Sequence, residues 1–398
     1  MLSLHVRAKR EKIVAVADIG SGSAGVAVVA ISPHGPARII AAERRRLPFE
    51  ERSVEATITG IAAQLSSAAE KALAVYRASP AGGGASGAVS PISSAYAIIR
   101  VPWTRSKTIR ALSKFPEERQ VTGPMIAEVA KAAFATPSVA GDEELDAANI
   151  LESSVVRVEL NGYPTAHPIG RRAHTLGVSV LVSDCDASVR KNVAETMSRV
   201  FACPPPALRS GTRALLTVLR ESPAFPDDCL IINMTSNATN LIVVTGGTAV
   251  RHTRIPEGVR SIVKRIGETG LPEETLTLIR MLAEDRCESE ACKATSAAIA
   301  RAEPDLARIF GEAMGRIAAT ERLPNALILA VQEDMAPWLS QFFSRIDFTQ
   351  FTVTTQPFEA AMITHKEIAD MVTFSVGVTP DPGLSIAGAL VNIESRHD

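Results

Sequence analysis

The first segment with chemical potential lies between two apolar runs near the N-terminus and reads Asp18-Ile19-Gly20-Ser21-Gly22-Ser23. Two glycines in a tight turn let backbone N–H groups come close to an anion. The Asp18 carboxylate could hold a magnesium ion through water. The alternative is an ordinary hairpin turn in which Asp18 bonds to its own backbone. The residues alone leave both interpretations open.

A second polar segment has the same setting between two apolar runs and reads Asn233-Met234-Thr235-Ser236-Asn237-Ala238-Thr239-Asn240. It has no glycine and no carboxylate. Asparagine supports turns, but it cannot take a proton from water or neutralise a divalent ion as a carboxylate does. The segment is therefore either a polar turn or a counterpart of the first that has lost its acid.

Other candidate residues have simpler explanations. A metal or phosphate role is conceivable for His167 and His174, but an exposed basic loop is favoured. The run Arg44-Arg45-Arg46 could bind an acidic partner, but a solvated strand end is favoured. Cys287 and Cys292 have no second pair near them, which favours two thiols on a helix over zinc. The sequence has no G-x-S-x-G elbow, the motif that would indicate hydrolase chemistry.

The elements that carry the two polar segments repeat along the chain. Three predicted strands (13–17, 26–31, 37–42) precede a predicted helix at 53–77, and three more (230–233, 241–245, 249–255) precede a helix at 259–266. The recurrence predicts two similar halves. Helices at 186–201 and 207–221 precede the second set. Helices in 273–320, a strand at 326–331, and helices at 337–343 and 383–391 follow it.

A compact unit separates the two halves. The Gly-, Ser- and Pro-rich stretch 78–94 predicts a domain boundary or a disordered loop. After it, the sequence predicts a strand at 95–101, a helix at 124–135 and strands at 150–160 and 175–182, with a turn at Asn161-Gly162. The order is strand–helix–strand–strand.

Composition narrows the class of protein. The chain has 398 residues, 46% hydrophobic and 21% charged, with a net charge of −1 and 4% aromatic residues. These values indicate a globular protein and do not favour a nucleic-acid binder. Five sparse cysteines disfavour a disulfide framework and suit a reducing compartment. The sequence has no apolar run of about 20 residues and no signal core, so we expect a cytoplasmic protein whose basic N-terminal arm is a solvated tail.

These motifs together resemble the actin-like ATPase superfamily, and most closely its bacterial FtsA and PilM families. The resemblance rests on Asp18 to Gly22, the later hairpin, Val158-Glu159-Leu160-Asn161-Gly162-Tyr163, His167-Pro168-Ile169-Gly170, and Ile255-Pro256-Glu257-Gly258. It implies an α/β, actin-like (ribonuclease H-like), two-lobed fold with an inserted strand–helix–strand–strand (SHS2-type) subdomain. The implied division is a first lobe at 1–90 and 184–224, the insert at 91–183, a second lobe at 225–375 with a reduced helical subdomain near 270–322, and a returning helix at 376–398.

The resemblance also implies a nucleotide site. Its residues would be Asp18 (with magnesium through water), Gly20, Ser21, Gly22, Ser23, Asn233, Thr235, Ser236, Asn237, Gly258 and Gln332. This sequence departs from the family pattern in two places. The second hairpin has Asn233 and Thr235 where the family has an acid and glycine. The adenosine segment has Val331 and Gln332 for a glycine pair, followed by two acids that would repel phosphate. We therefore expect an actin-like protein that does not hydrolyse ATP.

The expected function is a scaffold of bacterial cell division or type IV pilus assembly. Its partners would bind through the inserted subdomain, and copies of the chain could associate end to end. No amphipathic membrane helix of the FtsA type follows the last predicted helix, so the protein would reach the inner face of the membrane through partners. The alternative is an active ATP-binding, ATP-hydrolysing actin-like protein.

Overall fold

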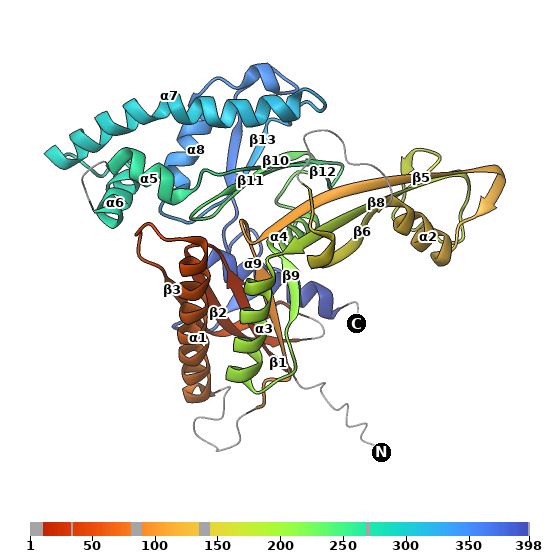
Figure 1. Cartoon of the computed structure of the whole chain (residues 1–398), viewed down its shortest axis with the longest axis horizontal. Helices are drawn as coiled ribbons and strands as arrows, with labels where there is room; N and C mark the ends of the chain where they lie inside the picture. Colours follow the sequence, from red (N-terminus) through yellow and green to blue (C-terminus); the bar gives the residue numbers. More distant parts are fainter. Residues whose placement is uncertain (1–10, 33–34, 81–89, 135–143, 268–270, 397–398) are drawn as a thin grey trace, which may run out of the picture. The chain divides into compact units, whose positions relative to one another are not determined.

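The computed structural model describes residues 11–32, 35–80, 90–134, 144–267 and 271–396. The N-terminal arm and most of the predicted linker therefore lie outside the described residues. Internal contacts divide the chain into two units (Figure 1). The first comprises Met1–Arg100, Ala187–Ala224 and Thr364–Asp398, and the second comprises Val101–Asp186 and Phe225–Ile363. Both units are thus built from segments far apart in the sequence.

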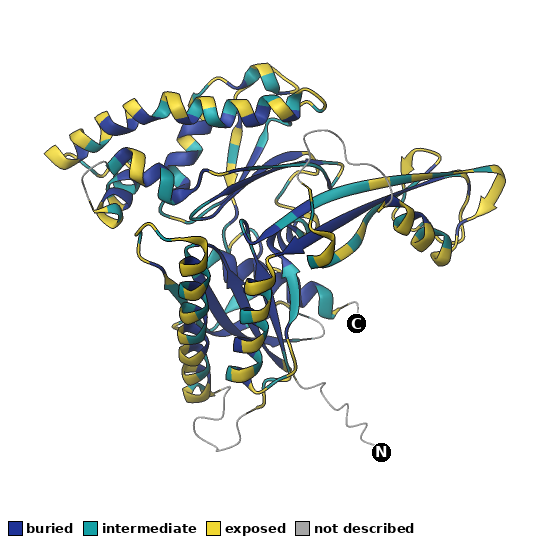
Figure 2. Ribbon diagram, viewed as in Figure 1, coloured by how far each residue is buried: buried dark blue, intermediate teal, exposed yellow. Residues whose placement is uncertain are grey.

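The first unit is built around a six-stranded sheet with the order β15-β3-β2-β1-β4-β9. The strands are β1 (Lys12–Ile19), β2 (Ser23–Ile31), β3 (Ala37–Arg46), β4 (Ser94–Ile99), β9 (Ala207–Ser210) and β15 (Val372–Phe374). Nearly every residue of β1 and β2 is buried (Figure 2). Such runs without alternation are typical of a strand covered on both faces.

Four helices belong to this unit: α1 (Val54–Ala78), α3 (Ala187–Phe201), α4 (Gly211–Glu221) and α9 (Pro382–Ser395). Helix α1 packs on β2, β3 and α3, and α9 packs on β1, β2, β3 and α4. Ser53 caps α1 and Asp381 caps α9, each through a side-chain oxygen that accepts a backbone N–H of the first turn. Helix α9 is buried from Gly383 to Ile393, so its small residues make it a central part of the core.

The second unit has a five-stranded sheet with the order β12-β11-β10-β13-β14. Its strands are β10 (Cys229–Met234), β11 (Thr239–Thr245), β12 (Thr248–Ile255), β13 (Ala326–Ala330) and β14 (Glu359–Met362). Its helices are α5 (Val259–Gly267), α6 (Pro272–Ala283), α7 (Glu290–Ala318) and α8 (Ala336–Arg345), with a short 3₁₀ turn at Thr349–Phe351. The buried rings of Phe310, Phe342 and Phe343 pack edge to face between α7 and α8.

The predicted repeat is present in the strand topology. In both units three consecutive strands pair antiparallel (β1-β2-β3 and β10-β11-β12), and the first pairs in parallel with a later strand, β4 or β13. Register adds a residue-level match, because Asp18 pairs with Gly25 and Asn233 pairs with Asn240, seven positions apart in each hairpin. Asp18 and Asn233 therefore occupy equivalent positions in the two halves.

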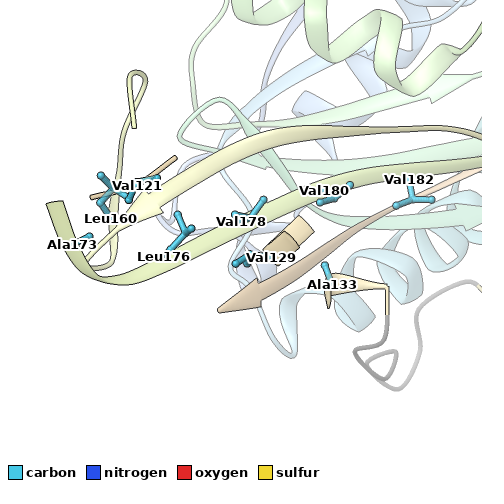
Figure 3. Packing of buried hydrophobic residues seen from close by; sticks show 9 residues of the cluster. All are labelled: Val121, Val129, Ala133, Leu160, Ala173, Leu176, Val178, Val180 and Val182. Atoms are coloured by element: carbon cyan, nitrogen blue, oxygen red, sulfur yellow. The ribbon is translucent and has the colours of Figure 1, made fainter. Parts of the chain in front are cut away.

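The inserted segment forms a four-stranded antiparallel sheet with the order β5-β8-β6-β7, which belongs to the second unit. Its strands are β5 (Thr104–Gln120), β6 (Ile150–Leu160), β7 (Tyr163–Pro164) and β8 (Arg172–Cys185), with a 3₁₀ turn at Ala147–Asn149. Helix α2 (Gly123–Ala133) covers one face of this sheet. Figure 3 shows the core between them, built from Val121, Val129, Ala133, Leu160, Ala173, Leu176, Val178, Val180 and Val182.

The prediction for the start of this insert is wrong. The predicted strand 95–101 corresponds to β4, which pairs with β1 and β9 in the first unit's sheet. The insert's first strand is β5, which no local pattern predicted. Strand β5 is rich in Arg, Lys and Glu, and mostly half-buried or exposed, so its apolar alternation is weak. The strand–helix–strand–strand order itself is present as β5, α2, β6 and β8.

Two further groupings differ from the expected division. Residues 364–375 belong to the first unit because β15 pairs in parallel with β3. The insert belongs with the second unit, where the Thr108 hydroxyl lies 3.2 Å from His252 Nε2 and Arg254 donates to the Pro102 carbonyl. The predicted helix 207–221 begins as strand β9 and becomes helix only at Gly211. These pairings join residues too distant in sequence for local patterns to indicate them.

Candidate functional site

Asp18, the expected metal-associated residue, is the centre of an ion cluster within the first unit. Its side chain is 2% exposed, and both carboxylate oxygens accept from arginines. Arg44 Nη2 lies 2.7 Å from Oδ2, and Arg100 Nε lies 2.6 Å from Oδ1. Register positions both arginines, because β3 pairs Arg44 with Gly25, and Arg100 follows β4 with its N–H bonded to the Ile19 carbonyl.

A second carboxylate completes the cluster. Arg44 Nε and Nη2 donate to the two oxygens of Asp381 at 2.5 and 2.8 Å, and Arg44 Nη1 donates to the Ser23 hydroxyl at 3.0 Å. Asp381 Oδ1 also accepts the Leu384 N–H and so caps α9. Two arginines and two aspartates give zero net charge. One guanidinium thereby joins the first hairpin, strand β3 and the start of the C-terminal helix.

The ionisation of the cluster follows from its burial and its pairing. Burial is the largest single influence and would raise the pKa of the Asp381 carboxyl. The Arg44 charge, the hydrogen bonds from Arg44 and the Leu384 N–H, and the Arg100 charge together outweigh burial and lower that pKa below its usual value. Burial alone would lower the pKa of Arg44, but Asp381 and Asp18 outweigh it and raise that pKa. Asp381 is therefore an anion, and Arg44 a cation, at neutral pH.

Close packing leaves little room at the Asp18 carboxylate. A Cβ atom at Gly383, in the first turn of α9, would overlap Asp18 Oδ2 and lie within 2.7 Å of the terminal nitrogens of Arg100 and Arg44. Gly383 therefore lets the helix backbone approach the ion cluster. The neighbouring turn is closed by its own backbone, since the Gly20 N–H donates to the Ser23 carbonyl at 3.0 Å, and Ser21 is fully buried.

These residues do not fit a magnesium ion held through Asp18. Both oxygens of the carboxylate already accept from guanidinium groups. A divalent cation brought to the same oxygens would be repelled by two positive charges within a few ångströms. The chain thus supplies at this position the positive charge that the resemblance assigns to a metal ion.

The second unit has neutral side chains at two of the equivalent positions, those of Asp18 and Arg100. Asn233 is the counterpart of Asp18. Asp18 pairs with residue 98, two positions before Arg100, and Asn233 pairs with residue 330, two positions before Gln332. Gln332 is therefore the counterpart of Arg100. Arg254 pairs with Asn240 as Arg44 pairs with Gly25, but its Nη1 donates to the Pro102 carbonyl. The two matching sites therefore differ at two positions: the second unit has the amide Asn233 in place of the carboxylate Asp18, and the amide Gln332 in place of the guanidinium of Arg100.

The second hairpin is packed against the N-terminus of α5. The Val259 and Arg260 N–H groups donate to the carbonyls of Thr235 and Ser236 at 3.0 and 2.9 Å. A Cβ atom at Gly258 would lie 2.6 Å from the Ser236 carbonyl oxygen. The first-turn N–H groups that could have faced an anion are bonded to the hairpin instead.

The predicted adenosine segment leads from β13 into α8. Gln332 is half-buried, and its carbonyl accepts the Met335 N–H at 3.0 Å. Of the two acids expected to repel phosphate, Glu333 is exposed and Asp334 pairs with Arg280 of α6 at 2.8 Å.

The structure brings the expected site residues together in two groups, each within one unit. Asp18, Gly20, Ser21, Gly22 and Ser23 form the first hairpin, whereas Asn233, Thr235, Ser236, Asn237, Gly258 and Gln332 surround the second. Sequence reasoning missed Arg100, Asp381 and Gly383, and it considered Arg44 only as a residue that could bind an acidic partner. The cap pattern Asp381-Pro382-Gly383 was a visible signal of a helix start, but its pairing with residue 44 was not.

Two simpler expectations have different outcomes. His167 and His174 are exposed, as predicted, but His174 lies in strand β8 and not in the predicted loop. The prediction of a solvated strand end is wrong for Arg44, whose side chain is 19% exposed and doubly paired, while Arg46 at the end of β3 is exposed. Arg44 therefore differs from Arg46 because Asp18 of β1 and Asp381 at the start of α9 pair with it.

The described residues contain neither a helix suited to cross a membrane nor a cluster suited to hold a metal ion. No helix among them is long and apolar enough to cross a membrane. Within the same ranges, no group of three or more His, Cys, Asp or Glu side chains could hold a metal ion.

The twin strand-and-helix units define an α/β protein of the actin-like fold, as the resemblance implied. A solved PilM-PilN type IV pilus biogenesis complex is similar to this chain, with a TM-score of 0.56 and 12% identity over 96% of this chain and 98% of that one. The ethanolamine utilization protein EutJ from Carboxydothermus hydrogenoformans has a TM-score of 0.43 and 8% identity over 96% and 89%. No protein-family model and no curated protein sequence matches the chain. At these identities the likeness concerns the fold.

Proposed function

We propose that this chain is a PilM-like scaffold of type IV pilus assembly that works through protein contacts and does not hydrolyse ATP. The observation that carries the proposal is the likeness to the PilM chain, which covers almost the full length of both proteins. The partner would be a PilN-type protein encoded by the same genome, and the inserted subdomain would be the contact region. The protein would act at the inner face of the membrane through this partner.

The ion cluster supports the non-hydrolysing part of the proposal. Metal-assisted hydrolysis of ATP would need a carboxylate free to hold the metal ion and a general base that takes a proton from water. Arg44 and Arg100 take both oxygens of Asp18, and the equivalent residue of the second unit is Asn233. A neutral amide cannot act as a general base. ATP and magnesium are therefore not part of the proposed activity.

Two measurements test the proposal together. Co-purification with the PilN homologue of the same genome should give one complex by size-exclusion chromatography. Millimolar Mg-ATP should leave Tm unchanged, whereas a ligand at 100 times its Kd would stabilise the fold by about 2.7 kcal/mol. ATP turnover that Asp18→Ala abolishes would overturn the non-hydrolysing role. A complex with division proteins instead of PilN would overturn the pilus assignment.

Self-association is a separate part of the proposal, because a head-to-tail contact of a single chain produces filaments when its rotation does not close a ring. Light scattering over a concentration series, with and without Mg-ATP, tests it. Growth of scattering that is independent of nucleotide is the expected result. A mass that stays at 42.2 kDa throughout would exclude it.

A further inference from the structure

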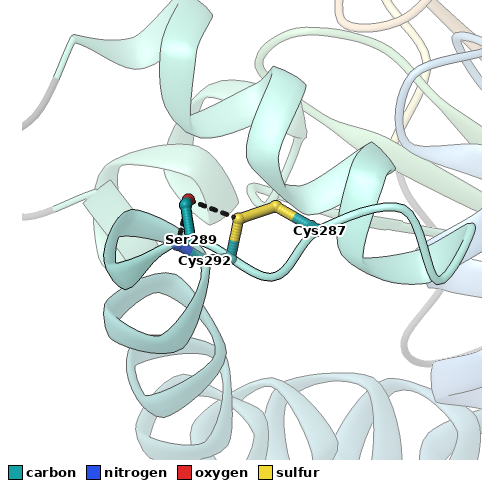
Figure 4. Close-up of a disulfide and its surroundings, with 3 residues drawn as sticks. All are labelled: Cys287, Ser289 and Cys292. Carbon is teal, nitrogen blue, oxygen red and sulfur yellow. Dashed lines mark hydrogen bonds between the residues drawn. A yellow bond between two sulfur atoms is a disulfide. The ribbon is translucent and has the colours of Figure 1, made fainter.

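The turn between α6 and α7 contains a disulfide that corrects the expectation of two thiols on a helix. Cys287 lies in the connecting turn and Cys292 in the first turn of α7, five positions apart, and their sulfurs are bonded (Figure 4). Cys185, Cys203 and Cys229 have reduced thiols that are outside the disulfide. The spacing of five placed both thiols on one predicted helix, but α7 begins only after Ser289.

The two sulfurs have different surroundings. Cys292 is 3% exposed, whereas Cys287 is half-buried between exposed neighbours. The Ser289 hydroxyl caps α7 by accepting the Cys292 N–H at 3.3 Å, and it lies 2.9 Å from Cys292 Sγ. A thiolate at Cys292 would be stabilised by this hydroxyl and by the helix N-terminus. Cys292 is thus the better leaving group, and Cys287 is the accessible sulfur.

The disulfide lies in the α6–α7 turn, and hydrogen bonds connect this turn and helix α6 to other parts of the second unit. The Arg286 N–H donates to the Met281 carbonyl at 2.9 Å, which ends α6. Helix α6 is held in turn to the segment before α8 by Arg280 and Asp334, and Gln341 of α8 donates to the Ala283 carbonyl at 2.8 Å. The position of this turn therefore bears on the segment that contains Gln332.

We propose that Cys287 and Cys292 form a reversible redox clasp that fixes the α6–α7 turn when oxidised and loosens it when reduced. A small-molecule thiolate attacks Cys287 Sγ, the S–S bond breaks, and Cys292 leaves as a thiolate that takes a proton from water. A second thiol then attacks the small-molecule sulfur of the mixed disulfide and releases Cys287. Two thiols are oxidised to one disulfide, and the protein disulfide is reduced to two thiols.

Alkylation of the full chain tests the chemistry. After oxidation with oxidised glutathione and unfolding in denaturant, intact mass should show three alkylated cysteines, and after dithiothreitol it should show five. Cys203→Ser is the matched control, because it removes a half-buried free thiol and should give two and four. Five alkylated cysteines after oxidation of the wild-type chain would overturn the proposal.

Hydrogen exchange tests the conformational part. Amides of residues 282–292 should exchange about fivefold faster in the reduced chain, and those of the second hairpin should not change. The Cys287→Ser/Cys292→Ser variant should exchange at the reduced rate under both conditions, while Cys203→Ser should respond as the wild type does. Equal rates in the oxidised and reduced wild-type chain would show that the bond controls nothing, which would contradict the clasp.

Discussion

At the scale of single residues, Arg44 connects more of the first unit than any other side chain described above. It contacts two carboxylates and a serine hydroxyl that come from β1, the first hairpin and the start of α9. A buried charge that loses its partner is costly, because neither water nor another group replaces the interaction. The cluster is therefore sensitive to the removal of a single member.

Replacing Arg44 by Ala should lower the free energy of unfolding by about 3 kcal/mol, because it leaves the half-buried Asp381 without its arginine partner and the buried Asp18 with Arg100 alone. Arg44→Lys should lose less, since it restores the charge without the fork of donors. Arg46→Ala, on the exposed end of the same strand, should change the value by less than about 0.5 kcal/mol. Urea denaturation measures all three, and equal effects of Arg44→Ala and Arg46→Ala would contradict the cluster's role.

The lowered pKa of Asp381 predicts how the stability of the fold changes with pH. Its pKa is lowered in the folded protein because Arg44, the Leu384 N–H and Arg100 together outweigh the effect of burial, so the unfolded chain binds a proton more readily than the folded chain. The contribution to stability is complete above the ordinary carboxyl pKa of about 4 and is lost as the pH falls through the lower folded value. Asp381→Asn should therefore be less stable than wild type at pH 7, and the gap should narrow below about pH 4. A gap that is constant down to pH 3 would exclude this linkage.

At the scale of elements, local patterns predicted most helices and the two hairpins but not the elements whose existence depends on distant pairing. Strands β1, β2 and β10 are continuous apolar runs, and α1 has a clear apolar stripe. Strand β5 packs Ile109, Ala111 and Phe115 against the core that it shares with α2, and most of its other residues are polar or charged. The twin hairpins could be predicted, but the ion cluster could not, because register across β3 and the place of α9 decide it.

The junction of the second hairpin with α5 gives a prediction about close packing. Gly258→Ala should destabilise the chain by about 1–3 kcal/mol, because its Cβ would meet the backbone of residues 236 and 238. Gly123→Ala in the first turn of α2 is the control, because nothing lies within 4 Å of that Cβ. Gly123→Ala should leave the free energy of unfolding unchanged or raise it slightly. Thermal unfolding followed by circular dichroism compares the two, and similar losses would show that the packing is loose.

The inserted sheet is held to α2 by an apolar core. Leu176 is fully buried in this core, and Leu176→Ala should lower the free energy of unfolding by about 2–5 kcal/mol. Leu112, on β5, is 49% exposed, and Leu112→Ala should lose less than about 1 kcal/mol. Both variants carry the same change in chemistry, so the difference between their urea midpoints reports burial alone.

At the scale of the whole molecule, the two ends of the inserted segment meet. Thr104 pairs with Cys185, and the Asp186 N–H donates to the Trp103 carbonyl at 2.8 Å. A segment whose ends are adjacent can be removed with little strain on the remainder. The insert is therefore a module in the path of the chain, although it packs on β12 within its unit.

Replacing residues 104–185 by a short Gly-Ser turn should leave a chain that folds and keeps the six-stranded sheet. We expect cooperative thermal unfolding and the dispersed amide spectrum of a folded protein. Removal of residues 376–398 should instead abolish folding, because α9 is buried along almost its full length. A folded chain without α9, or an unfolded chain without the insert, would contradict this view of the two segments.

Arg44 and Arg100 also bear on how the molecule responds to cellular conditions. Positive charge at Asp18 comes with the polypeptide as it leaves the ribosome, and it is present at fixed stoichiometry in every copy. Starvation, which drains triphosphates and alters free divalent ions, does not remove it. The ion pairs around Asp18 therefore form from the polypeptide's own side chains and do not depend on the cellular concentration of nucleotide or metal ions.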